Sequence, residues 1–473
     1  MTATDVDIII AGFGIAGASA AIAAHDAGAR VLVVEKTSAG GGNCRWSGGF
    51  LYAIDGPTAT DHLDAACYGK TERSVLEAYA SGTREIPAWI ESLGGKVRSL
   101  PTAIFSCPWP HFPGGGDDCI YRQIDSGQLP PGPAFWDLMA SAVERRDIEV
   151  VYDTAVVDLL VGGGAVFGAV VEAKGVRRSI TAAAVILASG GIEHDPYLRE
   201  TYLTLPVKPI GHPGNTGDAV RLAQKVGGAL WHMAAHFGWL AYARPEFPSA
   251  FGIDLMHGTS YLVVDEDGRR FSDETGRGGA HDFARFFPGQ ASRPRSRAFF
   301  VFDETARLSG SLNGIGGSPN DYRWSSDNSA EIEAGWITKA DTAHELAAAI
   351  GIDADALAST LAEFAEAAAI GADWRFDRPA ETIAALESPF YALEVVPGLA
   401  TASGGPRRDA RARIVRPGGE PIPGLYGVGG AGSIWGGQVT EQGGGLTDAI
   451  VFGRIAGADA SRIALADEQL QGA

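Results

Sequence analysis

A glycine motif between an apolar segment and an alanine-rich segment constrains this chain more than any other feature. Residues 6–11 (VDIIIA) form an apolar run too short for a helix and typical of a buried parallel strand. Residues 12–17 (GFGIAG) follow it and fit the pattern GxGxxG. Such glycines permit a tight turn, approach of a pyrophosphate and close helix–strand packing. A second apolar run, residues 31–34, ends at Glu35, where a carboxylate can bind both hydroxyls of a ribose. The combination predicts a dinucleotide-binding βαβ unit.

Glycine is abundant throughout the chain and is concentrated in short bursts. The chain has 473 residues and 64 glycines, about twice the usual ~7%. The bursts stand beside apolar runs, at residues 40–42, 48–49, 190–191, 404–405, 429–430 and 443–445. Glycine in such places indicates backbone that turns with positive φ or lies close to a ligand.

Charge and cysteine content exclude several classes of protein. The net charge of −19 argues against nucleic-acid partners and against an anionic membrane surface, because both need basic patches. The four cysteines form no CxxC and no zinc spacing, which favours a cytoplasmic location and predicts no metal site. No apolar run approaches the ~18 residues of a membrane helix, so we expect no membrane insertion.

A second glycine loop distinguishes between two dinucleotides. Residues 37–49 (TSAGGGNCRWSGG) follow Glu35 directly. A nicotinamide fold does not require such a loop, whereas the flat isoalloxazine ring of a flavin must lie along backbone. The sequence therefore favours FAD.

These segments resemble one flavoprotein family. Residues 6–49, 188–191, 215–218 and 423–457 are similar to fumarate reductases, succinate dehydrogenases and 3-ketosteroid dehydrogenases, most specifically at 423–430 (PGLYGVGG) and 451–457 (VFGRIAG). The resemblance implies an α/β fold, with a Rossmann-like FAD-binding domain built on a parallel sheet and an inserted α+β capping domain. We expect the FAD-binding domain at residues 1–231 and 388–473 and the capping domain at residues 232–387, where aromatics, a hairpin and an amphipathic helix change the texture of the sequence.

The resemblance and the motifs together predict the residues that contact FAD. Some relatives attach FAD through a histidine in the loop after the ribose acid. This chain has Asn43, Cys44 and Arg45 there, so we expect non-covalent FAD. The predicted contacts are Gly12, Gly14, Ile15, Ala16, Gly17, Glu35, Lys36, Gly41, Gly42, Asn43, Ser47, Gly48, Gly49, Ala155, Val156, Ala188, Ser189, Gly190, Asn215, Asp218, Gly429, Gly430, Gly445 and Leu446.

The substrate side departs from the fumarate reductase pattern. Two histidines and an arginine clamp the dicarboxylate in that group, and the corresponding positions here are close to Trp239, Thr401 and Thr440, although His236 lies near the first. Burying a dicarboxylate without such partners would cost several kcal/mol. We therefore expect an apolar or cyclic substrate. The predicted substrate residues are Trp239, Thr401, Gly404, Gly405, Trp435 and Gly444.

Four residues are candidates for acid–base chemistry. Arg277 resembles the proton-donating arginine of fumarate reductases, although a salt bridge in the cap explains it as well. His111 and Glu441 fall where ketosteroid dehydrogenases carry tyrosines, and Tyr261 is a further donor. The alternative interpretations are that His111 is a loop histidine hydrogen-bonded to backbone and that Glu441 caps the last helix.

The resemblance implies an FAD-dependent oxidoreductase acting on CH–CH groups. We expect it to dehydrogenate or reduce a C–C bond next to a ketone or carboxylate, with hydride moving to or from flavin N5. Its partners would be a small-molecule substrate and an external electron acceptor or donor. One alternative is a di- or tricarboxylate enzyme resembling tricarballylate dehydrogenase or fumarate reductase, in which Arg45, Arg277 or Arg407 replaces the clamp. Another is a flavin-binding sensor without turnover.

Overall fold

The chain divides into two compact units. The computed structural model describes residues 5–101, 111–115, 118–127, 129–203, 206–253, 258–274, 298–313, 317–437 and 443–471. Unit 1 comprises Met1–Thr204, Gly211–Phe237 and Thr401–Ala473, and unit 2 comprises Leu205–Ile210 and Gly238–Ala400. Arg277, Thr440 and Glu441 lie outside the described residues.

The unit boundaries differ from the expected insertion at residues 232–387, and strand pairing explains the difference. Strand β19 (Phe390–Leu399) pairs with β17 (Ala298–Asp303), which assigns the segment up to residue 400 to unit 2. Strand β13 (His236–Phe237) pairs with β20 (Thr401–Ala402), which keeps both within unit 1.

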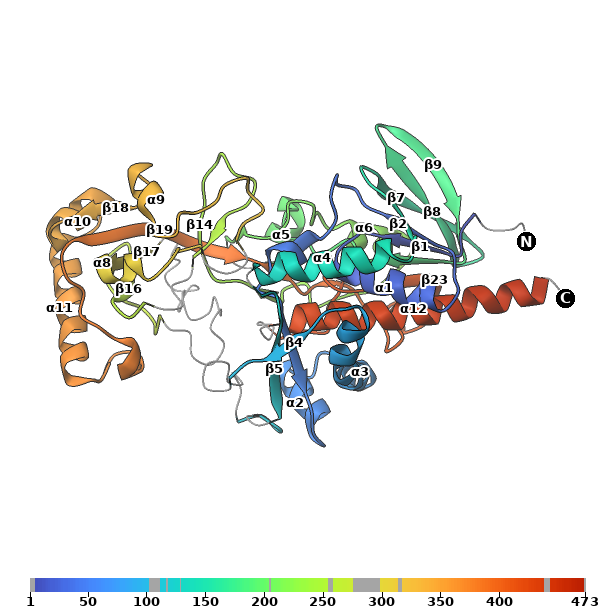
Figure 1. Cartoon of the computed structure of the whole chain (residues 1–473), viewed down its shortest axis with the longest axis horizontal. Helices are drawn as coiled ribbons and strands as arrows, with labels where there is room; N and C mark the ends of the chain where they lie inside the picture. Colours follow the sequence, from blue (N-terminus) through green and yellow to red (C-terminus); the bar gives the residue numbers. More distant parts are fainter. Residues whose placement is uncertain are drawn as a thin grey trace. The chain divides into compact units, whose positions relative to one another are not determined.

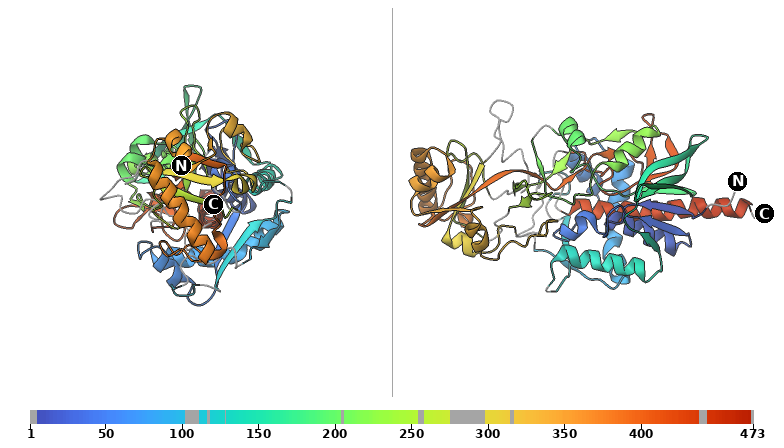
Figure 2. Two further views of the ribbon diagram at one scale, coloured as in Figure 1. Left: turned by 90° about the vertical axis from the view of Figure 1, so that its left-hand side faces the viewer. Right: turned by 90° about the horizontal axis from the view of Figure 1, so that it is seen from above.

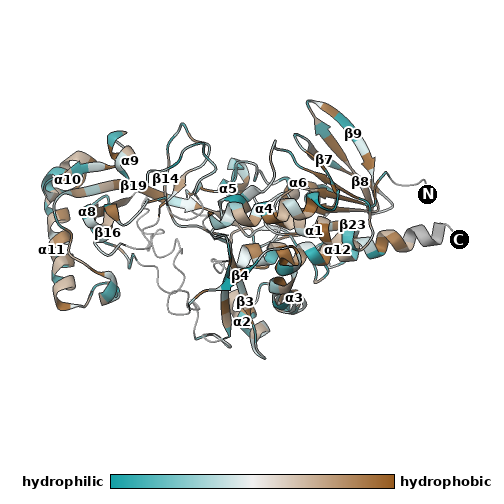
Figure 3. Cartoon of the chain, viewed as in Figure 1, coloured by the Kyte–Doolittle hydropathy of each residue, from teal (hydrophilic) through white to brown (hydrophobic). Residues whose placement is uncertain are grey.

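A largely parallel sheet forms the centre of unit 1, as predicted (Figure 1). Its strand order is β22-β23-β10-β1-β2-β6. The strands β1, β2 and β10 are buried along their whole length, because helices and sheets cover both faces of such strands. Figure 3 gives the hydropathy of each residue in the same view. The bounds are β1 Ile8–Ala11, β2 Val31–Val34, β6 Glu149–Val151, β10 Ala184–Leu187, β22 Arg413–Val415 and β23 Pro421–Gly427.

Parallel register brings the carboxyl ends of these strands to one edge. Ala11 pairs with both Leu187 and Val34, and Leu187 pairs with Gly427. The loops that follow these four residues therefore meet at the same edge, where open α/β sheets bind ligands. All four loops carry predicted FAD contacts.

Two helices pack against each other in unit 1 through glycines. Helix α1 (Ile15–Asp26) and helix α12 (Gly444–Gln471) lie side by side (Figures 1 and 2). A Cβ on Gly453 would stand 2.6 Å from the carbonyl oxygen of Ala16, and one on Gly457 would stand 2.3 Å from that of Ala20. Only glycine permits the two backbones to come this close.

Smaller elements complete unit 1. Residues 149–173 form β6, β7 and β8, with a glycine turn at residues 162–164 between the last two, and α6 follows the loop after β10. The remaining bounds are η1 Gly42–Trp46, β3 Phe50–Ile54, α2 Ala59–Ala66, α3 Arg73–Ser92, β4 Val97–Ser99, β5 Cys119–Ile124, α4 Pro131–Glu144, β7 Ala155–Gly162, β8 Ala165–Ala173, β9 Val176–Thr181, α5 Pro196–Tyr202, α6 Asp218–Lys225, β12 Leu230–Trp231, β13 His236–Phe237, β20 Thr401–Ala402 and β21 Gly405–Pro406.

Unit 2 is an α+β unit built on an antiparallel sheet. The central strand order is β15-β14-β19-β17-β16, with β11 and β18 also paired to β19. The predicted hairpin is present, since β16 is followed by a bridge between Val264 and Arg270, and the predicted amphipathic helix is α11. The bounds are β11 Lys208–Pro209, β14 Leu240–Tyr242, β15 Phe251–Gly252, β16 Tyr261–Asp265, β17 Ala298–Asp303, α8 Glu304–Leu308, α9 Ser329–Glu333, β18 Thr338–Ala340, α10 Ala343–Ile350, α11 Ala354–Ile370, η2 Ala380–Thr382 and β19 Phe390–Leu399. Among the described residues of the whole chain, no helix has the length and hydropathy needed to cross a membrane.

Candidate cofactor site

The three glycines of the first motif have different reasons to be glycine. Gly12 has φ +109°, and a Cβ there would stand 2.5 Å from the carbonyl oxygen of Ala188. A Cβ on Gly17 would stand 2.0 Å from the carbonyl oxygen of Gly12. Gly14 has extended backbone (φ −95°), and its Cβ would meet only the Gly41 carbonyl oxygen, at 3.7 Å. The fold thus requires Gly12 and Gly17, whereas the polypeptide around Gly14 has room for a side chain.

The N-terminus of α1 is buried and has no side-chain cap. Gly14 occupies the N-cap position, and the first turn contains no acidic residue. Ile15 and Ala16 are each 6% exposed. The first N–H groups of a helix have no partner within the helix, and together with the helix dipole they form an anion-binding site. This end of α1 therefore fits a pyrophosphate group.

Backbone donors orient the carboxylate of Glu35. Its Oε2 accepts a hydrogen bond from the Phe13 N–H at 2.8 Å, and its Oε1 accepts bonds from the Thr37 N–H at 2.9 Å and the Thr37 hydroxyl at 2.7 Å. The carboxylate is part-buried, and each of its oxygens can accept a further bond. This arrangement fits a ribose whose two hydroxyls donate to one carboxylate.

Two other predicted contacts pair with each other. The ammonium group of Lys36 donates to Asp218 Oδ2 and to the Thr216 hydroxyl, both at 2.7 Å. This ion pair links the end of β2 with the start of α6, so it holds together the loops on either side of the sheet edge.

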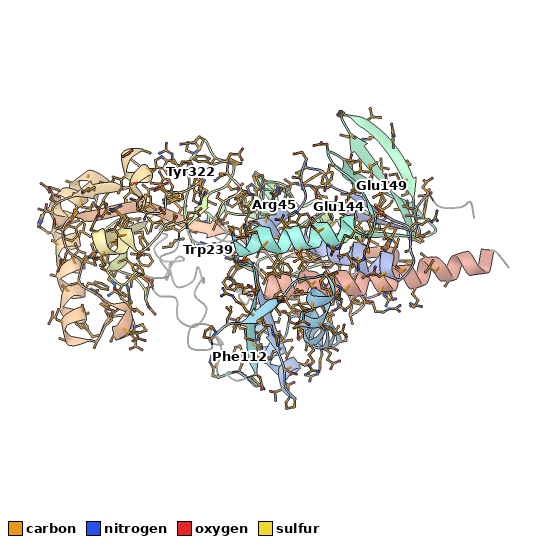
Figure 4. All side chains as sticks on the ribbon, viewed as in Figure 1. Arg45, Phe112, Glu144, Glu149, Trp239 and Tyr322 are labelled. Atoms are coloured by element: carbon orange, nitrogen blue, oxygen red, sulfur yellow. The ribbon has the colours of Figure 1, made fainter. Side chains whose placement is uncertain are left out.

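The second glycine loop lies against the first. The Gly41 N–H donates to the Phe13 carbonyl oxygen at 2.7 Å, and Gly14 and Gly41 form a parallel bridge. Arg45, labelled in Figure 4, follows in η1. The side-chain oxygen of Asn43 accepts a bond from the His212 N–H at 2.7 Å. The adjacent predicted contacts Gly42, Ser47, Gly48 and Gly49 belong to this same loop.

The Cys44 thiol is an apolar part of this loop. It is 2% exposed, and burial raises its pKa to about 12. The thiol therefore remains protonated and packs as a small hydrophobic group.

Glycines from the C-terminal segment approach the same place. Gly429 has φ +63°, and a Cβ there would stand 2.8 Å from the Cβ of Ala16. A Cβ on Gly430 would stand 3.2 Å from the Gly191 nitrogen. Gly445, at the start of α12, has no atom within 4 Å of the position of its Cβ. The loops after β1, β10 and β23 and the start of α12 thus gather around one region of unit 1.

Some polar side chains in these loops have no hydrogen-bond partner among the described residues. The buried Ser189 hydroxyl, the Ser433 hydroxyl and the Trp46 indole N–H form no hydrogen bond in the described structure. Buried polar groups normally have partners. The uncapped helix, the oriented carboxylate and these unused groups fit a large polar dinucleotide.

Comparisons with known proteins agree with this geometry. The family model described as FAD binding domain matches residues 7–447. The chain belongs to this family. Its curated relatives include a fumarate reductase (cytochrome) from Shewanella frigidimarina, 28% identical over 97% of this chain and 77% of that protein. A 3-oxosteroid 1-dehydrogenase from Mycolicibacterium smegmatis is 30% identical over 69% of this chain and 62% of that protein.

A solved structure confirms the fold class. The crystal structure of 3-ketosteroid Δ1-dehydrogenase from Sterolibacterium denitrificans, in complex with 1,4-androstadiene-3,17-dione, superposes with a TM-score of 0.82 at 22% identity and covers 97% of this chain and 99% of that chain. The family match and the curated relatives confirm the prediction of an FAD-dependent oxidoreductase acting on CH–CH groups, in the superfamily of fumarate reductases and ketosteroid dehydrogenases.

Sequence reasoning missed a buried acid in this FAD-binding family member. Glu193 is fully buried, and its Oε1 accepts a bond from the Ala402 N–H at 2.7 Å, while its Oε2 forms no hydrogen bond within the part of the chain that the structure describes. Burial raises its pKa to about 7. A Cβ on Gly191 would stand 2.6 Å from Oε1. The only signal in the sequence was an acid two residues after a glycine pair.

The predicted substrate glycines are held by backbone contacts inside unit 1. A Cβ on Gly404 would stand 2.4 Å from the Met233 Cα, and one on Gly405 would stand 2.5 Å from the Gly432 nitrogen. Thr401, in β20, is partly exposed.

Trp435, a predicted substrate residue, lies in the hydrophobic core of unit 1. Its side chain is fully buried. The ring lies 5.9 Å from that of Tyr52 and 5.8 Å from that of Tyr79, and a Cβ on Gly444 would stand 2.5 Å from it. A contact between this indole and a substrate stays a prediction.

The remaining candidates are dispersed. His111 is exposed, with its ring 4.6 Å from that of Phe112, which is labelled in Figure 4. In unit 2, Trp239 is partly exposed and packs on Gly252. Tyr261 is 7% exposed, and its ring stacks on that of Phe300 at 5.1 Å, which is the environment of a core tyrosine.

Two arginines proposed as replacements for the clamp have different surroundings. Arg407 is bound by Glu72, whose Oε1 accepts from its Nε at 2.7 Å. Arg45 forms no ion pair with a carboxylate among the described residues, and its guanidinium lies 6.0 Å from the ring of Trp46. Arg45 is therefore the better candidate of the two.

A buried charge cluster lies directly before the segment that contains Arg277. In unit 2, Glu274 accepts from Arg270 at 2.7 Å and from Arg378 at 3.0 Å, and Arg270 also donates to Asp373 at 2.8 Å. Side-chain exposure of these four groups does not exceed 5%. The Glu274 carboxylate is thus engaged in ion pairs with Arg270 and Arg378 inside unit 2.

Proposed function

We propose that this chain binds FAD non-covalently and dehydrogenates or reduces a C–C bond α,β to a ketone or carboxylate in an apolar or cyclic small molecule. The observation that carries the proposal is the buried, uncapped N-terminus of α1 beside Gly14, next to the oriented Glu35 carboxylate. An external acceptor or donor exchanges electrons with the protein.

Each part of the site has a defined task. The N–H groups of α1 and the loop of Gly14 bind the pyrophosphate, and Glu35 binds the ribose. Bound FAD supplies a hydride acceptor or donor at N5. The N-terminus of α12, at Gly445 and Leu446, presents a positive dipole end that favours the negative charge of the reduced cofactor. Gly41, Gly429 and Gly430 allow backbone to lie flat beside the ring.

The charges of residues 401–408 support the proposed substrate class. Thr401 stands where a fumarate reductase carries a histidine, and the first arginines of the segment, Arg407 and Arg408, are already bound by Glu72 and Asp448. Both guanidinium groups are already paired with a carboxylate of the protein, so neither is available to bind a dicarboxylate substrate. Desolvating such a substrate without a cation costs several kcal/mol, so an uncharged ketone fits this segment better.

The acid–base group belongs to a residue that contacts the substrate α-carbon. His111 is the candidate with an exposed ring. An imidazole suits proton transfer near neutral pH. Arg277 and Glu441 stay candidates from the sequence.

One experiment separates the substrate classes. The holoprotein is assayed with cyclic ketones, including 3-ketosteroids, and with succinate, fumarate and tricarballylate, using an artificial electron acceptor for oxidation and a reduced viologen for reduction. We expect turnover of cyclic ketones. Turnover of succinate or fumarate at ordinary enzyme rates would contradict the charge argument.

The second candidate function is a carboxylate enzyme, favoured by the similarity to fumarate reductase and by the unpaired Arg45. It predicts turnover of tricarballylate that is lost in Arg45→Gln and retained in the control Arg407→Gln. A sensor without turnover predicts that no compound in the panel bleaches the flavin absorbance.

The mode of attachment has its own test. Residues 35–49 contain no histidine, so acid precipitation should release all of the flavin into the supernatant. Flavin that stays with the pellet would show a covalent bond.

A further inference from the structure

Unit 1 contains a buried ion pair, between Arg408 and Asp448, that none of the sequence motifs predicts. Arg408 follows the glycine pair at 404–405, and Asp448 lies in the first turns of α12. Their side chains have no exposed surface, and Arg408 Nη2 donates to Asp448 Oδ1 at 2.5 Å. A buried arginine–aspartate ion pair therefore lies next to the first turns of α12.

The pair joins two segments that carry predicted FAD contacts, the loop after β23 and the start of α12. Arg408 Nη1 donates to the carbonyl oxygen of Gly427 at 3.3 Å, at the end of β23 and directly before the glycine loop. Asp448 Oδ1 also accepts from the Ile434 N–H at 3.4 Å, at the other side of that loop. The Arg408 guanidinium stacks on the ring of Phe452 at 3.9 Å, one turn further along α12. The pair thus fixes both sides of the loop against the helix.

The pair is not saturated with hydrogen bonds. Arg408 Nε and Asp448 Oδ2 form none in the described structure. Burial raises the pKa of the Asp448 carboxyl, although the nearby guanidinium opposes this. A buried pair with unused groups stabilises a fold no better than hydrophobic side chains of similar size. We therefore expect these charges to contribute to the position of the loop and of α12, and to the electrostatic potential at the cofactor.

We infer that Arg408 and Asp448 are positioning residues that fix the start of α12 and the loop at residues 428–434 against the flavin, and that Asp448 cancels the charge of Arg408 so that no buried ion shifts the reduction potential of the cofactor. The inference rests on the proposed function, because it places FAD at Gly429, Gly430 and the start of α12. Charges in a water-poor interior are weakly screened, so an unbalanced ion here acts on the flavin directly.

The test measures the midpoint potential of the bound flavin in four proteins. In Asp448→Asn the uncompensated Arg408 cation stabilises the reduced, anionic flavin. We expect the equilibrium constant for reduction to rise at least tenfold, about 30 mV for a two-electron couple. In Arg408→Gln the potential does not rise, and the double variant returns to within threefold of the wild-type constant. Arg454→Gln, which removes a charge at the surface of the same helix from its pair with Glu85, is the matched control and leaves the potential unchanged.

A second readout concerns position. Arg408→Gln loses the bond to Gly427, so its affinity for FAD falls at least tenfold, and this holds even where Asp448→Asn does not fold. An Asp448→Asn potential within threefold of wild type, or a shift of the same sign in both single variants, would overturn the electrostatic part. Unchanged FAD affinity in Arg408→Gln would overturn the positional part. Failure of the proposed function is distinct, because the wild-type protein itself would then contain no flavin.

Discussion

The two units treat their buried polar groups in opposite ways. In unit 2, Arg378 donates to Glu274, to the carbonyl oxygens of Tyr261 and Thr382, and to further oxygen acceptors. In unit 1, buried polar atoms without a partner include those of Ser189, Glu193, Ser433 and Trp231. Among the described residues of unit 2, only the Ser272 hydroxyl is in that position. Among the described residues, unit 2 therefore leaves one buried polar side-chain atom without a partner, whereas unit 1 leaves several.

Helix N-termini differ in a similar way at the sheet edge of unit 1, with two exceptions elsewhere: α5 in unit 1 is capped by Asp195, and α9 in unit 2 has no side-chain cap. In unit 2, α8, α10 and α11 are capped by the side chains of Asp303, Thr342 and Asp353. In unit 1, α1 and α6 begin at Gly14 and Gly217, without a side-chain cap. A capped helix has used its first donors, whereas an uncapped one has them available for a ligand. The comparison indicates that unit 1 is built to be completed by a bound molecule.

The largest effect on stability should come from opening the charge cluster of unit 2. Arg378→Ala leaves Glu274 buried with one partner fewer, so we expect the free energy of unfolding to fall by about 3–5 kcal/mol. Urea unfolding followed by tryptophan fluorescence measures it. The control is Arg375→Ala, which breaks a half-exposed pair with Glu363 and should cost less than about 1 kcal/mol. Equal effects of the two variants would remove the contrast between the units.

Glu193 supplies the matching test in unit 1, through pH. The folded state keeps its proton up to a pKa of about 7 because the carboxyl is buried, whereas the unfolded chain loses it in the usual acidic range. Between those values the folded state binds more protons, so the free energy of unfolding falls as the pH rises, by up to about 3 kcal/mol in total. Glu193→Gln should flatten this decline. Identical slopes for both proteins between pH 5 and pH 8 would contradict the assignment.

The smallest predicted effect concerns a cap. Thr342 accepts from the Glu345 N–H at 3.1 Å in a capping box, so Thr342→Ala should cost about 1 kcal/mol. The FAD content of the protein should not change. A loss of flavin in this variant would mean that the caps of unit 2 also serve the cofactor.

Much of the FAD-binding unit could be predicted because its constraints are local. A strand, a glycine motif, a helix and an acid follow one another in the chain, and each of Gly12, Gly17 and Glu35 has a physical reason visible in its neighbours. The hairpin at Tyr261 was predictable on the same grounds.

Other features depend on contacts between distant residues and leave no mark in a short segment. Glu193 acquires its role only when Ala402 pairs with it, and Arg408 only when α12 brings Asp448 to it. The ring of Trp435 packs near those of Tyr52 and Tyr79, and Gly444 makes room for it, which no short segment of the sequence reveals. Unit 2 extends to residue 400, beyond the expected residue 387, because β19 pairs with β17 over residues 390–395 and with β14 over residues 396–397.

The central claim is that the uncapped N-terminus of α1 binds the pyrophosphate of FAD, and Gly14→Asp tests it most directly. The backbone at Gly14 accommodates a side chain. An aspartate there would cap the helix and repel phosphate. The measurement is the molar ratio of flavin to protein, with the melting temperature of the apoprotein beside it. We predict about one flavin per wild-type chain, none in Gly14→Asp, and an apoprotein that melts no lower than wild-type apoprotein. A Gly14→Asp protein that retains stoichiometric FAD would contradict the account.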